Sequence, residues 1–472
     1  MMPTERDDAS PRRLVQPDGR RAQRRGVAVP VLPDTSHETI QRHVMDKIAL
    51  GGGILFAEGH WWERSAIGAW VPMLESRIWA ETQAINGFET LEGSGSKAGG
   101  KCVRVNASMC SSVEALARAR FGDSTAFSDP AVGFVTPAGV WSYSADKGWS
   151  AREPGHADRV RMWVNADPDL DESHAPSQWF GVLHRMWGAE PDYKERCWAL
   201  HEFLGAVLMG TATKYQKAPI LLGDGENGKS VIVEVLTGCV PANLRCSVTP
   251  EDLEGNRFAS SNLVGKALNA VAELPGSGGE LLTSHRIKSI IDGSEQGAEK
   301  KGKDGFTFRP IAGHLFAANG LPRVRDLSHG FWRRWLLLTC PAPKISREER
   351  RFDLAAAILA SETPQILGLA LRCYAAMVNE GRGYTDVPSS SEAIRAWRGE
   401  SDSVQAWVED ATEPGGPSAT RGLYDHYKRH AEDNGSRPVG SKTFSTRLDA
   451  LGLREVRTAS ARMRPITVKV GP

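Results

Sequence analysis

The residues best suited to chemistry lie in residues 218–235, which read APILLGDGENGKSVIVEV. A short apolar run of strand length precedes GDGENGKS, which fits the pattern GxxxxGK[ST], and the residues after it can open a helix. In that context the loop N–H groups and the helix N-terminus bind phosphate, Lys229 reaches the β- and γ-phosphates, and the Ser230 hydroxyl ligates Mg²⁺. The alternative, a glycine-rich hairpin turn, leaves the register of Gly-Lys-Ser unexplained. We therefore expect ATP and Mg²⁺ to be bound by Gly223, Asp224, Gly225, Glu226, Asn227, Gly228, Lys229, Ser230 and Val231.

Two polar residues follow apolar runs further along the chain. Residues 267–274, ALNAVAEL, predict a strand ending at Glu273, and residues 314–319, HLFAAN, predict a strand ending at Asn319. An acid at the tip of a neighbouring strand can help to hold Mg²⁺ and orient the attacking water, and an amide can sense the γ-phosphate. Ala272 stands where a second acid would be useful, so Glu273 serves both roles or another acid contributes. Taken singly, the two residues could equally be a surface acid and a turn amide.

Two basic clusters complete the candidate site residues. Arg333 and Arg334 precede an apolar strand at residues 336–338, and a surface arginine there could reach the nucleotide of a neighbouring subunit. Lys300, Lys301 and Lys303 lie in the glycine-containing turn EKKGKDGF, where a hairpin could carry them to DNA phosphates. A solvated loop is the alternative for the lysines. The order and spacing of all these features after the phosphate loop favour the functional interpretation.

Length and composition frame these motifs. A chain of 472 residues suggests roughly three domains, and 40% hydrophobic residues suffice for sizeable cores. The net charge of +1 requires any nucleic-acid affinity to come from local patches. Seven cysteines without a CxxC pair indicate isolated thiols in a reducing compartment. We find no apolar run near the ~18 residues of a membrane span and no secretory signal, which predicts a cytoplasmic protein without membrane contact.

The predicted fold class is α/β, with a P-loop ATPase core, a mixed α/β N-terminal region, a helical collar and a C-terminal winged helix. The winged helix is expected from two helical patterns followed by two strands around an arginine-rich tip, Arg454, Arg457, Arg462 and Arg464. The predicted segments are a disordered basic arm (1–34), the α/β region (35–175), the collar (176–215), the ATPase core (216–345), a helical extension with a Ser-rich linker (346–400) and the winged helix (401–472).

These motifs resemble those of superfamily 3 helicases, and of the primase-helicases of phages, plasmids and poxviruses in particular. The resemblance rests on GDGENGKS, ALNAVAEL, KSIIDG with EKKGKDGF, HLFAANGLP and GFWRRW, and covers about residues 180–345. It implies Walker A residues Lys229 and Ser230, a Walker B residue Glu273 and a sensor Asn319. It also implies an AAA+-type ATPase core, an arginine finger at Arg333 or Arg334, DNA-tracking lysines at 300, 301 and 303, and a ring hexamer around one DNA strand.

The leading hypothesis is an ATP-dependent DNA helicase that replicates a phage, plasmid or integrated mobile element. Its expected partners are single-stranded and forked DNA, five further copies of the chain, and a primase or polymerase. A separate primase is expected because the residues before the collar contain no catalytic carboxylate set for priming. An alternative is an origin-binding initiator or scaffold whose assembly ATP controls. A small-molecule P-loop kinase is a third hypothesis, but it leaves the winged helix and the paired arginines without a role.

Overall fold

The computed structural model describes residues 31–49, 52–91, 101–129, 131–155, 157–274, 280–281, 285–302, 304–324, 326–434, 438–458 and 461–469. The chain divides into two compact units, one of residues 1–45 with 78–116 and one of residues 46–77 with 117–472. The expected region 35–175 is therefore not one unit, because residues 46–77 and 117–175 group with residues 176–472. Most of the expected basic arm, residues 1–30, lies outside the described residues.

The smaller unit holds most of three helices, α1 (His37–Ala49), α2 (Glu75–Ala84) and α3 (Ala107–Phe121). Buried apolar side chains at Ile40 and Val44 mark the inward face of α1. The larger unit begins with two small antiparallel sheets. One contains β1 (Ile54–Ala57), β2 (His60–Arg64) and β3 (Trp70–Met73), and the other contains β4 (Phe134–Thr136), β5 (Gly139–Ser144) and β6 (Gly148–Arg152).

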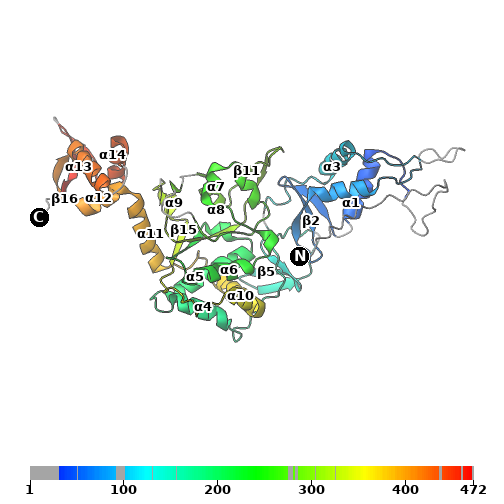
Figure 1. Cartoon of the computed structure of the whole chain (residues 1–472), viewed down its shortest axis with the longest axis horizontal. Helices are drawn as coiled ribbons and strands as arrows, with labels where there is room; N and C mark the ends of the chain where they lie inside the picture. The colour runs from blue at the N-terminus through cyan, green and yellow to red at the C-terminus, as the bar shows by residue number, and fades with distance from the viewer. Residues whose placement is uncertain are drawn as a thin grey trace, which may run out of the picture. The chain divides into compact units, whose positions relative to one another are not determined.

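A five-stranded parallel sheet is the centre of the larger unit (Figure 1). Its strand order is β15-β7-β13-β9-β8. The strands are β7 (Ala218–Leu222), β8 (Arg245–Cys246), β9 (Leu268–Val271), β13 (Gly313–Ala318) and β15 (Trp335–Thr339). All six residues of β13 are buried, as a strand covered on both faces requires. The mixed α/β class with a parallel sheet thus agrees with the sequence.

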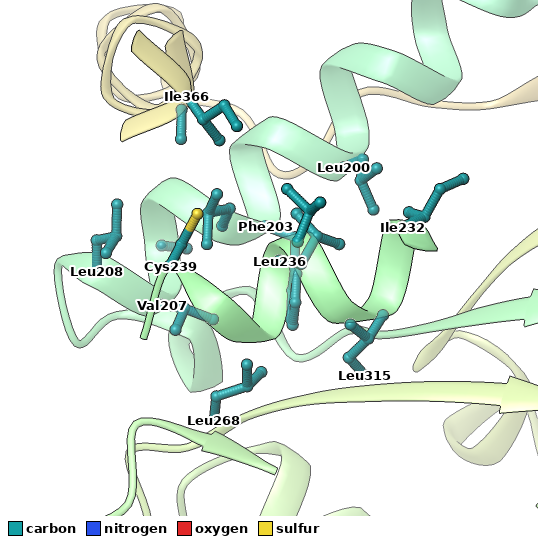
Figure 2. Packing of buried hydrophobic residues seen from close by; sticks show 14 of the residues in the cluster. Leu200, Phe203, Val207, Leu208, Ile232, Leu236, Cys239, Leu268, Leu315 and Ile366 are labelled. Atoms are coloured by element: carbon teal, nitrogen blue, oxygen red, sulfur yellow. The ribbon is translucent and has the colours of Figure 1, made fainter. Parts of the chain in front are cut away.

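Alternate side chains of the strands enter two separate cores. On one face, Leu221, Leu315 and Leu338 pack with helices α4 (Ser177–Trp187), α5 (Tyr193–Leu208), α6 (Lys229–Gly238) and α10 (Leu354–Asn379). Figure 2 shows this core, with side chains from α5, α6 and α10 converging on Leu268 and Leu315. On the other face, Ile220 and Phe316 pack with α8 (His285–Ile291), α9 (His329–Trp332) and α11 (Pro388–Ser401).

Helix α10 corrects one expectation. It is the single helix among the described residues that is long and apolar enough to cross a membrane by length and composition, whereas we expected no such run. Its apolar residues Ile358, Ile366, Leu367 and Leu371 are buried in the core of the larger unit, where α10 packs against α5 and α6. Its hydropathy is accounted for by this packing.

Helix α11 corrects the expected linker. Ser390 is buried in the first turn of α11, and its Oγ accepts a hydrogen bond from the backbone N–H of Leu337, at 2.8 Å. Further along, Trp397 packs against Phe331, Trp332 and Trp335. Ser390 therefore contacts the central sheet, and the separate C-terminal core begins only after Ser401.

The C-terminal segment forms its own core from α12 (Ser403–Ala411), α13 (Thr420–Asp433), α14 (Ser441–Ala450) and a sheet of order β16-β18-β17. The strands are β16 (Thr412–Ala419), β17 (Val456–Arg457) and β18 (Arg462–Val468). Three strands replace the two expected. The Pro-Gly-Gly-Pro stretch belongs to edge strand β16, where the pairing register shifts between Pro414 and Ser418, and an edge strand with a bulge tolerates proline.

The remaining short elements surround the sheet. They are α7 (Pro250–Gly255), β10 (Glu280–Leu281), β11 (Gln296–Ala298), β12 (Phe306–Phe308), β14 (Arg323–Val324), and the 3₁₀ helices Ala212–Tyr215, Ala242–Leu244 and Ala259–Leu263. β11 and β12 pair as an antiparallel hairpin whose connecting turn carries the basic cluster.

Candidate nucleotide site

The phosphate loop joins the carboxyl end of β7 to the amino end of α6. Gly225 and Gly228 have φ of +85° and +94°, a backbone conformation that favours glycine. The Asn227 Nδ2 donates to the carbonyl oxygen of Cys340, at 2.8 Å, and so ties the loop to the end of β15. The loop is thereby anchored at the helix N-terminus, where backbone N–H groups attract anions.

Lys229 lies in the first turn of α6 and is buried. Its Nζ donates to the carbonyl oxygens of Gly223 and Ala318, at 2.9 and 2.6 Å, and to Asn319 Oδ1, at 2.7 Å. Burial lowers the pKa of Lys229, and nearby Cys340 and Glu273 oppose that shift. The ammonium thus has three neutral acceptors, which anionic phosphate oxygens would replace favourably.

Glu273 and Asn319 follow the carboxyl ends of β9 and β13, two adjacent strands. The Asn319 Nδ2 donates to Glu273 Oε1, at 3.0 Å, while its Oδ1 accepts from Lys229. One amide therefore connects the lysine to the acid, and both Glu273 and Asn319 are exposed to the cavity side. This crevice beyond the carboxyl ends of parallel strands is where α/β sheets bind ligands.

The residues expected to hold Mg²⁺ suit that ion. Ser230 is exposed in the first turn of α6, and Glu273 offers a carboxylate across the same cavity. In the part of the chain that the structure describes, no group of three His, Cys, Asp or Glu side chains forms a metal cage. Mg²⁺ does not need one, because it is usually held by one or two protein oxygens together with phosphates and waters.

A cavity of about 750 Å³ contains these residues. Its volume lies within the roughly 300–1,000 Å³ of small-molecule sites. The phosphate loop forms one wall, and residues 344–355, which follow β15, form another. This second wall was not predicted from the sequence, because residues 344–353, KISREERRFD, match no motif. The position of this segment over the phosphate loop depends on the fold.

Glu226 connects the two walls. Its backbone oxygen accepts from the N–H of Ile345, at 2.8 Å, and its carboxylate contacts Arg350 Nη2, at 2.6 Å, and Lys344 Nζ, at 3.5 Å. Hydrogen bonding and attraction to Arg350, and then to Lys344, lower the pKa of Glu226. Two cations are therefore held at the rim of the cavity by an acid of the phosphate loop.

The two arginines before β15 have different environments. Arg334 is buried and makes a bidentate ion pair with Asp292, with Nε to Oδ1 at 2.8 Å, as well as donating to Gly330 O. Arg333 is exposed and donates to Gln216 Oε1, at 2.6 Å. The donors of Arg334 are thus bound within its own chain, and Arg333 is the one of the two arginines that could contact another molecule.

The sheet register places Arg333 far from the phosphate loop of its own chain. Trp335 pairs with Ala218 at the start of β7, and Thr339 pairs with Leu222, which precedes Gly223. The four residue steps from Trp335 to Thr339 span about 13 Å. Arg333 therefore lies at the amino ends of the strands, whereas the cavity lies beyond their carboxyl ends.

The basic turn lies between β11 and β12. Lys300 and Lys301 are exposed, while Lys303 lies outside the described residues. Glu299 at the base of the turn pairs with Arg257 at 3.5 Å. The expected hairpin is present, and its role in binding DNA stays a prediction.

In the C-terminal segment, Arg464 departs from the expected arginine-rich tip. It is buried and contacts Asp449 and Glu455. Arg457 and Arg462 are exposed on the β17–β18 pair, although Arg462 lies 3.6 Å from Glu455. Arg464 is therefore a structural residue of this core, and it does not belong to a DNA-binding surface.

This chain resembles known proteins over a short stretch of sequence and, weakly, in its structure. A family of unknown function, DUF5906, matches residues 221–334, which is less than half of the chain. No curated protein matches it significantly. The apo NrS-1 C-terminal region (305–718) is similar with 12% identity and a TM-score of 0.48, covering 91% of this chain and 98% of that one. A JCV helicase is similar with 14% identity and a TM-score of 0.27, covering 50% and 66%. TM-scores below 0.5 establish neither the family nor the activity of this chain.

Proposed function

We propose that this chain is an ATP-hydrolysing DNA helicase of the superfamily 3 type. The observation that carries the proposal is the linked set Lys229, Asn319 and Glu273, in which Lys229 follows the phosphate loop and the other two follow the carboxyl ends of the adjacent parallel strands β13 and β9. The strand order, with β7 between β15 and β13, supports an AAA+ core. The helices and three-stranded sheet after Ser401 support a winged-helix module.

The site's residues have separable tasks in this proposal. The phosphate-loop N–H groups bind the β- and γ-phosphates, and Lys229 exchanges its carbonyl partners for phosphate oxygens. Ser230 and Glu273 hold Mg²⁺, which would neutralise charge on the phosphates. Glu273 accepts a hydrogen bond from the attacking water and orients it, while Asn319 contacts the γ-phosphate and couples its presence to Glu273.

DNA would contact the lysines of the β11–β12 turn, and a neighbouring copy would supply Arg333. Arg333 lies at the amino ends of the strands, away from the cavity of its own chain, and this location supports a site shared between subunits of a ring. Six copies are the expected number. Hydrolysis would move the turns along one DNA strand, whose phosphates they bind without reading sequence. The proposed role is replication of a phage, plasmid or mobile element.

ATP hydrolysis tests the chemistry. Lys229→Ala should abolish phosphate release, because the site loses its main countercharge for the transferring group. Lys147→Ala is the matched control, since Lys147 is exposed in the turn between β5 and β6 and should leave activity unchanged. Wild-type protein that neither binds nor hydrolyses ATP would refute the proposal.

The separate C-terminal core keeps a second candidate open, an origin-binding initiator whose assembly ATP controls. That protein would bind duplex DNA through the C-terminal segment and hydrolyse ATP slowly. Strand displacement on forked DNA distinguishes the two, because an initiator without motor activity leaves the strands paired.

A further inference from the structure

Phe352 is the most exposed large apolar side chain in the described part of the chain, at 93% exposure, and it lines the nucleotide cavity. It lies directly before Asp353 and the first turn of α10. An exposed phenylalanine leaves roughly 150–250 Å² of apolar area in water. Covering that area at about 25 cal/mol per Å² would be favourable, which raises the question of what covers it.

The cavity lining combines two kinds of chemistry. It contains the phosphate loop with Lys229 and Ser230, and it contains the apolar groups of Ile345, Phe352, Leu354 and Ala355. A nucleoside triphosphate has the same division between a charged chain and an aromatic base. The cavity is therefore complementary to the whole nucleotide, and Phe352 is the aromatic side chain in its lining on which a base could stack.

Contacts on both sides of Phe352 hold the backbone segment that carries it before a nucleotide arrives. On its N-terminal side, Ile345 and Arg350 are bonded to Glu226 of the phosphate loop. On its C-terminal side, α10 packs against α6, the helix that begins at Lys229. A platform held in place in advance reduces the entropy cost of binding.

We propose that Phe352 is the platform on which the base of the bound nucleotide stacks. This inference rests on the proposed function and adds the residue that holds the base. Stacking on an aromatic ring is tolerant of base identity because every base has a π-face. Phe352 thus strengthens binding of any nucleoside triphosphate, and it contributes nothing to a triphosphate that lacks a base.

The test compares ATP analogue, GTP analogue and inorganic tripolyphosphate, each as a competitor of a fluorescent nucleotide on the full chain. Phe352→Ala should weaken both nucleotides about 5–150-fold, the range expected for loss of one aromatic stack, and leave tripolyphosphate within twofold. Phe352→Trp should retain nucleotide affinity. Phe352→Leu, which keeps apolar volume without a ring, should behave like Phe352→Ala.

Val456→Ala is the matched control, because Val456 is also an exposed apolar residue but lies in the C-terminal sheet. Equal weakening of tripolyphosphate and nucleotides by Phe352→Ala would show that Phe352 supports the phosphate loop, which overturns the proposal. Unchanged nucleotide affinity would overturn it too, and loss of self-association in that variant would assign Phe352 to a subunit contact. Failure of the proposed function is distinct, since the wild type would then bind neither nucleotide nor tripolyphosphate.

Discussion

Arg333 and Arg334 are adjacent in sequence, yet their replacement should have opposite consequences. Arg334→Ala removes the bidentate partner of Asp292, whose side chain is only 16% exposed. Breaking a buried pair by removing one member costs up to about 3–5 kcal/mol of unfolding free energy. Arg333→Ala removes an exposed side chain with one hydrogen bond to Gln216, and its effect on stability should stay within about 0.5 kcal/mol.

Their effects on hydrolysis should be reversed. An arginine supplied by a neighbouring subunit can be worth about 10³–10⁵ in rate. Arg333→Ala should therefore lose hydrolysis by that order while binding ATP normally, because at least about 13 Å of strand separates it from its own phosphate loop. Any loss of activity in Arg334→Ala should instead follow its loss of folded protein, and Arg334→Lys, which retains one charge, should be intermediate in stability.

The assay combines urea unfolding, nucleotide binding and phosphate release for each variant. Mixing Arg333→Ala with Lys229→Ala should restore part of the activity, because some interfaces then contain an intact phosphate loop and an intact arginine. Arg333→Ala protein that hydrolyses ATP at the wild-type rate would refute the assignment. Co-assembled mixtures that stay inactive at every ratio would refute the shared site.

Three further predictions concern the β11–β12 turn, the C-terminal segment and two buried histidines. Lys300→Ala with Lys301→Ala should lower single-strand affinity and reduce the salt slope by about 0.7 per lost phosphate contact, whereas an unchanged slope would mean that the lysines face solvent. Truncation after Ser401 should weaken duplex-DNA binding and leave basal ATPase activity intact, because the removed residues have their own core; unchanged duplex affinity would assign that segment to protein contacts. Burial lowers the pKa of His201 and His314 to about 4, below the ~6.5 of an unfolded chain. Between these two pH values the unfolded state therefore binds more protons than the folded state. The free energy of unfolding should fall as the pH decreases from 6.5 to 4, by about 1.4 kcal/mol per pH unit for each histidine. Urea unfolding at several pH values measures this slope, and His314→Leu should reduce it. A slope unchanged by His314→Leu would mean that His314 is protonated in the folded state.

The geometry around His201 explains why it stays neutral. Trp179 Nε1 donates to His201 Nε2, at 2.8 Å, and His201 Nδ1 lies 2.6 Å from the carbonyl oxygen of Cys197. A carbonyl only accepts, so Nδ1 carries the proton and Nε2 must be the acceptor. Protonation of Nε2 would set two N–H groups against each other, which agrees with a lowered pKa.

Local signals were enough to predict the strand, loop and helix around Lys229. Glycines at 225 and 228 and the apolar strand before them specify a strand–loop–helix unit without long-range information. Glu273 and Asn319 were expected to act with Lys229 because each ends an apolar strand pattern, and the hydrogen bonds among the three agree with that expectation.

Features that depend on tertiary packing were not predictable in the same way. Nothing in the letters RR distinguishes Arg334, which pairs with Asp292, from Arg333, and Arg464 appeared surface-exposed until its contacts with Asp449 and Glu455 were known. Phe352 and Arg350 follow no motif because their place over the phosphate loop is set by where β15 ends and α10 begins.

The central claim is that ATP hydrolysis at this site drives strand separation. Its most direct test is displacement of a labelled strand from forked DNA by wild-type protein and by Glu273→Gln, with ATP binding measured in parallel. We expect the wild type to displace the strand only with hydrolysable ATP, and Glu273→Gln to bind ATP and DNA but displace nothing. Strand displacement by Glu273→Gln at the wild-type rate, or none by a wild type that hydrolyses ATP and binds the fork, would contradict the account.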